Sequence, residues 1–166
     1  MVTTTRTEID RDVRAAVATV LDPELPMISI EDLGILRDVT VDGDVVHVTI
    51  TPTYAGCPAM AAIRDDVEAA VLAVAPAHAV VVETVLAPAW STDDITADGL
   101  LRLAAAGISP PIGRGASGPT LLRLSVRCPQ CGSPDTRELS RFGSTACKAL
   151  WVCNACTEPF DRFKEL

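Results

Sequence analysis

The stretch ILRDVTVDGDVVHVTITPT, residues 35–53, decides the fold of the first half of the chain. Val46, Val48 and Ile50 alternate with other residues, as in a strand that buries one face. Residues 42–44, Asp-Gly-Asp, interrupt this alternation with the residue types that favour a tight hairpin turn. The stretch therefore predicts two antiparallel strands joined by a short turn.

Helical periodicity flanks this hairpin on both sides. A first helix is expected from Thr7 to the turn at residues 22–26, and its apolar face would carry Ile9, Val13, Val17, Val20 and Leu21. Pro58 suits the first position of a second helix, with an apolar face of Met60, Ile63, Val67 and Val71. A β-branched third strand at 78–86 and a helix at 96–107 complete the order α-β-β-α-β-α. We expect an α+β protein that begins with a small two-layer α/β domain.

Proline and glycine divide the chain after this domain. Residues 109–122 hold enough of both to break any regular element, so they predict a linker between a domain at 1–108 and a separate unit at 123–166. Charge also differs: residues 1–110 carry 17 acidic and 6 basic side chains, whereas 111–166 carry 5 and 8. The acidic first part argues against nucleic-acid binding.

Two sequence features bear on cellular location. The first 20 residues lack a basic region followed by an apolar one, so they do not resemble a signal or transit peptide. The most apolar stretch, residues 69–82, is short and contains Pro76, which argues against a membrane span. A cytoplasmic protein without a membrane partner is expected.

The C-terminal unit contains two CxxC pairs. These four residues, called here the cysteine tetrad, are Cys128, Cys131, Cys153 and Cys156. Two such pairs on tight turns can surround a zinc ion tetrahedrally, which predicts a structural zinc ribbon with no open coordination position. The alternatives are an iron or iron-sulfur centre on the same thiolates, or disulfides, which the absence of an export signal disfavours.

Cys147 lies between the two CxxC pairs, on a stretch expected to be a ribbon strand. It is interpreted either as a small buried apolar residue or as an auxiliary metal ligand.

Cys57 stands apart from the other cysteines, between Gly56 and Pro58. At a helix N-terminus, unpaired amides and the helix dipole would favour its thiolate, but a packing role is equally compatible with this position. His47 and His78 fall on or beside predicted strands, so neither is an evident catalytic base.

The turn DPELP, residues 22–26, carries the carboxylates Asp22 and Glu24. Most such turns only end a helix. If this turn faced Cys57, hard oxygen and soft sulfur donors would share one cleft, which would suit transient binding of iron.

These motifs carry a family resemblance. DPELPMISIEDLG (22–34) and TPTYAGCPA (51–59) resemble the iron-sulfur cluster assembly domain of maturation factors. The order of LAPAWSTDDIT, GISPP, CPQCGSPDT, FGSTACKALWVC and EPFDRFK further resembles the PaaD family of phenylacetate catabolism. The assembly-domain pattern maps onto Asp22, Pro23, Glu24, Pro26, Asp32, Leu33, Gly34 and Cys57.

The resemblance implies an accessory protein of phenylacetyl-CoA epoxidase with no catalysis of its own. Its partners would be the oxygenase and reductase subunits, and its role would be assembly of an iron or iron-sulfur centre. The main alternative is a structural or regulatory subunit that transfers no metal. A thiol-dependent enzyme and a nucleic-acid-binding ribbon are weaker alternatives, and exposed domain edges would permit a homodimer.

Overall fold

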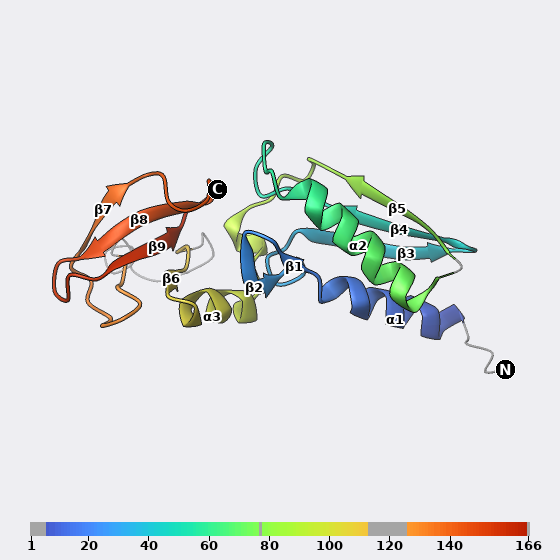
Figure 1. Ribbon diagram of the computed structural model, residues 1–166, viewed down its shortest axis with the longest axis horizontal. Helices are drawn as coiled ribbons and strands as arrows, with labels where there is room; N and C mark the ends of the chain where they lie inside the picture. The colour runs from blue at the N-terminus through green and yellow to red at the C-terminus, as the bar shows by residue number, and fades with distance from the viewer. Residues whose placement is uncertain (1–5, 77, 113–125, 166) are drawn as a thin grey trace. The chain divides into compact units, whose positions relative to one another are not determined.

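The computed structural model describes residues 6–76, 78–112 and 126–165, with the side chains of Arg6 and Thr7 excepted. The chain divides after Trp90 into two compact units, Met1–Trp90 and Ser91–Leu166, shown in Figure 1. Both units contain helix and strand, which confirms the α+β class. The division lies upstream of the expected domain end at residue 108, and residues 113–122 of the expected linker fall outside the described residues.

The first unit is built on the predicted hairpin. Its strands β3 (Leu36–Asp42) and β4 (Val45–Ile50) pair antiparallel around Gly43, whose φ of 59° suits a residue without a side chain. The third strand, β5 (Ala79–Thr84), runs parallel to β4, so the sheet order is β3-β4-β5. A parallel pair needs a crossover connection, and the second predicted helix supplies it.

Two helices, α1 (Arg6–Ala18) and α2 (Met60–Val74), lie on the same side of this sheet in Figure 1. The predicted apolar faces are confirmed for the most part. The side chains with no exposed surface in this layer include Val13, Val17, Val46, Val48, Ile50, Ile63, Val67 and Val71. Met60 is only half-buried because it occupies the first turn of α2.

The segment between α1 and β3 differs from the prediction. Helix α1 ends at Ala18, and two short strands follow, β1 (Leu21–Asp22) and β2 (Leu25–Ser29), which form a separate two-stranded sheet. Leu21 was expected on the buried helix face but is 49% exposed. It lies beyond the helix end, so helical periodicity no longer determines which way its side chain points.

The second unit begins with helical segments. A 3-10 turn, η1 (Thr92–Asp94), precedes α3 (Ala97–Ala105). The Thr96 hydroxyl accepts a hydrogen bond from the Gly99 amide at 3.0 Å, and Gly107, with a φ of 79°, follows the helix end, as the sequence predicts.

A four-stranded sheet completes this unit. Its strands are β6 (Ile108–Ser109), β7 (Thr136–Ser140), β8 (Lys148–Cys153) and β9 (Pro159–Phe163), in the order β6-β9-β8-β7. Residues 126–165, which hold β7, β8 and β9, are called the ribbon below. Strand β6 runs parallel to β9, so Ser109 belongs to a strand although the linker was expected to start there.

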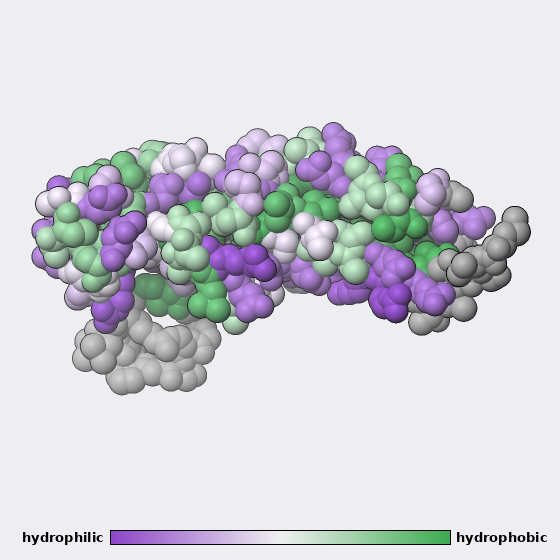
Figure 2. Space-filling view, turned by 60° about the horizontal axis from the view of Figure 1, so that its bottom comes forward, coloured by the Kyte–Doolittle hydropathy of each residue, from purple (hydrophilic) through white to green (hydrophobic). Residues whose placement is uncertain are grey.

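No helix within the described part of the chain is long and apolar enough to cross a membrane. Hydrophilic residues are spread over both units on the face shown in Figure 2.

Candidate metal sites

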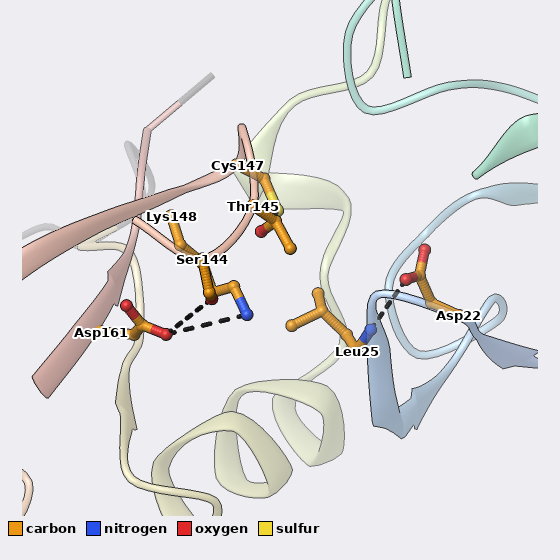
Figure 3. A network of polar contacts seen from close by, with 7 residues as sticks. All are labelled: Asp22, Leu25, Ser144, Thr145, Cys147, Lys148 and Asp161. Atoms are coloured by element: carbon orange, nitrogen blue, oxygen red, sulfur yellow. Dashed lines mark hydrogen bonds and ion pairs between the residues drawn. The ribbon is translucent and has the colours of Figure 1, made fainter. Parts of the chain in front are cut away.

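The DPELP turn is held by one of its own carboxylates. Asp22 is 4% exposed, and its Oδ1 accepts hydrogen bonds from the backbone amides of Glu24 at 2.8 Å and Leu25 at 3.0 Å (Figure 3). Because the Asp22 carboxylate satisfies the amides two and three residues further along the chain, the chain reverses between β1 and β2. Asp22 therefore has a structural task in addition to any role with a metal.

Cys57 lies in the loop between β4 and α2 and is half-buried. Its backbone amide donates to the carbonyl of Tyr54 at 3.1 Å. The N-cap of α2 is Ala59, so two residues separate Cys57 from the first residue of the helix. Pro58 was expected at the first helical position but lies before the N-cap.

The electrostatic setting of Cys57 differs from the expected one. Burial raises the pKa of its thiol above the ordinary value of 9.0, and the carboxylates of Asp22 and Glu24 raise it further. Hydrogen bonds from the Ala59 backbone amide and the Thr53 side chain lower the pKa but do not outweigh these effects. The predicted stabilisation of the thiolate by the helix N-terminus is therefore wrong in its net effect.

The same interactions place three predicted residues in one neighbourhood. The negative charges of Asp22 and Glu24 raise the pKa of the Cys57 thiol, so the turn lies near enough to the loop to influence it within the first unit. Sequence reasoning missed Thr53, although its place in the same loop as Cys57 was visible. His47 is exposed on β4, and His78 lies just before β5. Among the described residues, the donor atoms close enough together to hold one metal ion are those of the four cysteines in the second unit, and the donors of Asp22, Glu24 and Cys57 do not form such a group.

The cysteine tetrad is assembled in the second unit. Its four Sγ atoms all lie within 4.8 Å of one another. Both CxxC pairs sit on similar turns: the Gly132 amide donates to the Cys128 carbonyl and the Thr157 amide to the Cys153 carbonyl, each at 2.9 Å. Gly132 and Thr157 have φ values of 72° and 64°, which close each turn tightly around its sulfurs.

The sulfur spacing fits a tetrahedral metal ion. Sulfurs held about 2.3 Å from a central ion at tetrahedral angles lie about 3.8 Å apart. The separations here are 3.7 Å for Cys128–Cys156 and 3.6 Å for Cys131–Cys153. All six cysteines of the chain are free, so the tetrad is not two disulfides in this structure.

Burial and charge differ among the tetrad residues. Cys128 and Cys153 are buried, whereas Cys131 and Cys156 are exposed. Hydrogen bonds from the backbone amides of Cys156 and Ala155 lower the pKa of the Cys153 thiol to about 7, whereas burial and the neighbouring tetrad thiols raise the pKa of Cys156 to about 12. A thiol that loses its proton near neutral pH is prepared to act as a metal ligand.

Cys147 lies outside the tetrad. It occupies the turn before β8 instead of the expected strand, it is 5% exposed, and its Sγ lies 3.0 Å from the Thr145 hydroxyl (Figure 3). The neighbouring Lys148 is buried and lies 3.8 Å from Asp161, which also accepts a hydrogen bond from Ser144. Among the described residues, the cysteines close enough together to hold a metal ion are those of the tetrad, and Cys147 is not one of them. This favours the interpretation of Cys147 as a small buried residue.

Comparison with known proteins places both sites in recognised families. Residues 10–84 match the family described as iron-sulfur cluster assembly protein, and residues 115–164 match the PaaD zinc beta ribbon domain. A protein of Escherichia coli K12, provisionally named as one of the subunits of 1,2-phenylacetyl-CoA epoxidase, is 43% identical over 92% of this chain and 91% of its own length.

Two further relatives match the first part of the chain. An Fe-S protein maturation auxiliary factor of Porphyromonas gingivalis W83 is 33% identical over 58% of this chain and 91% of its own length. A crystal structure of a domain of unknown function from Bacillus anthracis is 29% identical, with a TM-score of 0.54, over 58% of this chain and 92% of that one. The chain therefore belongs to the PaaD family, and it joins an iron-sulfur cluster assembly domain to a PaaD zinc beta ribbon domain.

Proposed function

We propose that this protein is an accessory factor of phenylacetyl-CoA epoxidase that assists assembly of an iron or iron-sulfur centre in the oxygenase or its reductase. The observation that carries the proposal is that the carboxylates of Asp22 and Glu24 lie near enough to the Cys57 thiol to raise its pKa. These three residues lie in the part of the chain that matches iron-sulfur cluster assembly proteins. The name of the Escherichia coli relative supports the epoxidase as the client.

The raised pKa of Cys57 suits temporary binding of a metal cargo. Near neutral pH the thiol is mostly protonated, so the empty site does not hold three negative charges together. An arriving iron ion would displace the proton from the sulfur, and the carboxylates that disfavoured the thiolate would then attract the cation. Return of the proton to the sulfur would weaken the bond again, which favours passing the cargo on.

The cysteine tetrad is proposed to hold a structural zinc ion. Four thiolates at tetrahedral spacing would leave no open position for a substrate. Zinc would supply a fixed centre for the two turns of the ribbon. Elemental analysis of the purified protein tests this assignment. A ratio far below one zinc per chain would contradict it. Bound iron that remains in the Cys57→Ser variant would contradict it too, because that iron would then occupy the tetrad.

A second candidate function is that of a structural or regulatory subunit. Phe142 and Leu139 of the ribbon are 83% and 46% exposed, which favours a surface that docks on another protein. Under this alternative Cys57 only fills space in its loop.

Replacement of Cys57 by serine separates the two functions. The variant would be expressed with the epoxidase subunits, and the iron content of the purified epoxidase would be measured by mass spectrometry. Maturation predicts an iron-deficient epoxidase beside a folded accessory protein, while Cys147→Ser serves as the matched control with normal loading. Normal iron content with Cys57→Ser, together with a stable stoichiometric complex on gel filtration, would favour the subunit role instead.

A further inference from the structure

A charged cavity of about 190 Å³ opens in the second unit, and its lining includes none of the candidate metal ligands. It is lined by residues of β7, β8 and β9 and of the segments that follow β7 and β9: Glu138, Arg141, Ala149, Arg162, Lys164 and Glu165. Arg162 and Lys164 belong to the EPFDRFK motif, to which the metal sites give no task.

Arg162 is the most enclosed cation of this cavity. Its side chain is 14% exposed, its Nη2 donates to the Glu165 carboxylate, and its Cζ lies 5.4 Å from the centre of the Trp151 ring. The Nε–H is buried and has no acceptor among the described residues. The contact with the indole ring and the ion pair together restrain the guanidinium.

The charges of the lining do not cancel. Three basic side chains face two acidic ones, and the acidic groups are already engaged. Glu165 Oε1 also accepts from the Ile112 amide at 3.0 Å, and Glu138 lies 3.9 Å from Arg141. Lys164 Nζ donates to the Ala146 carbonyl at 2.7 Å and lies 5.7 Å from the centre of the Phe142 ring, and it carries two further N–H donors. The cavity is therefore suited to an acceptor with a single negative charge.

We propose that this cavity binds a carboxylate group, with Arg162 as the planar recognition group and Arg141 and Lys164 beside it. Arginine pairs with carboxylates through two parallel N–H donors, and a guanidinium already restrained by an ion pair and a ring contact loses little freedom when it binds one. A phosphate dianion would exceed the net charge of the lining and would meet repulsion from Glu138 and Glu165. The carboxylate comes either from a small free acid or from an acidic side chain of a peptide.

Nitrogen-15 NMR of the full metal-containing chain tests this binding directly. The Arg162 Nε–H and Trp151 Nε1–H signals are the reporters, while Trp90 Nε1–H, bonded to the Leu33 carbonyl at 2.9 Å, is an internal reference. The probes are sodium acetate, an end-blocked tetrapeptide with one glutamate, and inorganic phosphate, all at equal ionic strength. Saturation by acetate identifies a free acid as sufficient, and saturation by the peptide alone identifies a peptide carboxylate. Either result supports the proposal.

Substitutions at the rim keep the test independent of folding. Arg141 is 88% exposed, so Arg141→Gln leaves the fold intact and should weaken binding about two- to fivefold. Glu138→Gln should tighten carboxylate binding. Arg162→Lys should weaken carboxylate binding about tenfold, because the two parallel N–H donors of the guanidinium are lost although the positive charge remains. Arg137→Gln, an exposed cation of β7 outside the lining, is the matched control. Unsaturable shifts, tighter binding of phosphate than of either carboxylate, or no response to Arg141→Gln and Glu138→Gln would overturn the proposal.

Discussion

Removal of metal from the cysteine tetrad is expected to unfold the ribbon while the first unit stays folded. The ribbon has a small apolar core, in which Val126, Cys128, Cys153 and Phe160 are buried together and Trp151 packs against them. Two of these four buried residues are themselves tetrad cysteines. The ribbon core and its proposed metal site are therefore largely the same structure.

The magnitudes favour unfolding. Val126, Phe160 and Phe163 are the large apolar side chains that the ribbon buries, and burial contributes about 1.5–3 kcal/mol for each, or about 5–9 kcal/mol together. A structural zinc ion contributes about 10–16 kcal/mol at neutral pH. The metal would thus supply more free energy than the apolar core. Without it, the conformational entropy lost on ordering the ribbon, about 1–2 kcal/mol per residue, would exceed what this apolar core supplies.

The assay combines a chelator titration with nitrogen-15 NMR, and released metal is quantified with a colorimetric indicator. Signals of residues 126–165 should collapse into the range of unfolded chains as metal leaves, whereas those of the β3-β4-β5 sheet should stay dispersed. Cys131→Ser should reproduce the collapse without chelator, and Cys147→Ser should not, because Cys147 lies outside the tetrad. Dispersed ribbon signals in protein shown to be metal-free would refute the reasoning.

Three further predictions concern single residues. Glu24→Gln removes a negative charge that raises the pKa of Cys57, so the pH midpoint of Cys57 alkylation by iodoacetamide should fall and the rate near neutral pH should rise; an unchanged rate would contradict the proposed proximity. Gly143→Ala should destabilise the second unit by about 1–3 kcal/mol in urea unfolding, because a Cβ would lie 3.0 Å from the Lys148 backbone. Ile63→Ala should cost the first unit about 2–5 kcal/mol in the same measurement, and a smaller loss would mean that the core of α2 repacks.

The sequence predicted the elements whose signals are local and periodic. The alternation at Val46, Val48 and Ile50 predicted β4, and the spacing of Ile63, Val67 and Val71 predicted α2. The CxxC spacing likewise predicted the residues of the tetrad, because each pair forms its own turn before the two turns meet.

What the sequence did not predict depends on contacts between distant segments. Strand β6 contains only Ile108 and Ser109, which is too short for any periodicity, and it exists because β9 pairs with it. The pKa of Cys57 depends on burial and on carboxylates from a distant turn, so the local helix argument gave the wrong direction. The position of Cys147 before β8 similarly follows from where pairing with β9 begins.

The unequal exposure of the tetrad sulfurs determines how a bound ion would be exchanged. Each CxxC turn contributes one buried and one exposed cysteine residue, so one side of a bound ion would lie nearer to solution. A competing thiol or chelator can add from that side before any bond to the protein has broken. Metal exchange would then be associative, with a rate that rises with the concentration of the competitor, and would not have to wait for the protein to open. The buried pair would determine how tightly the ion is held, and the exposed pair how fast it is replaced.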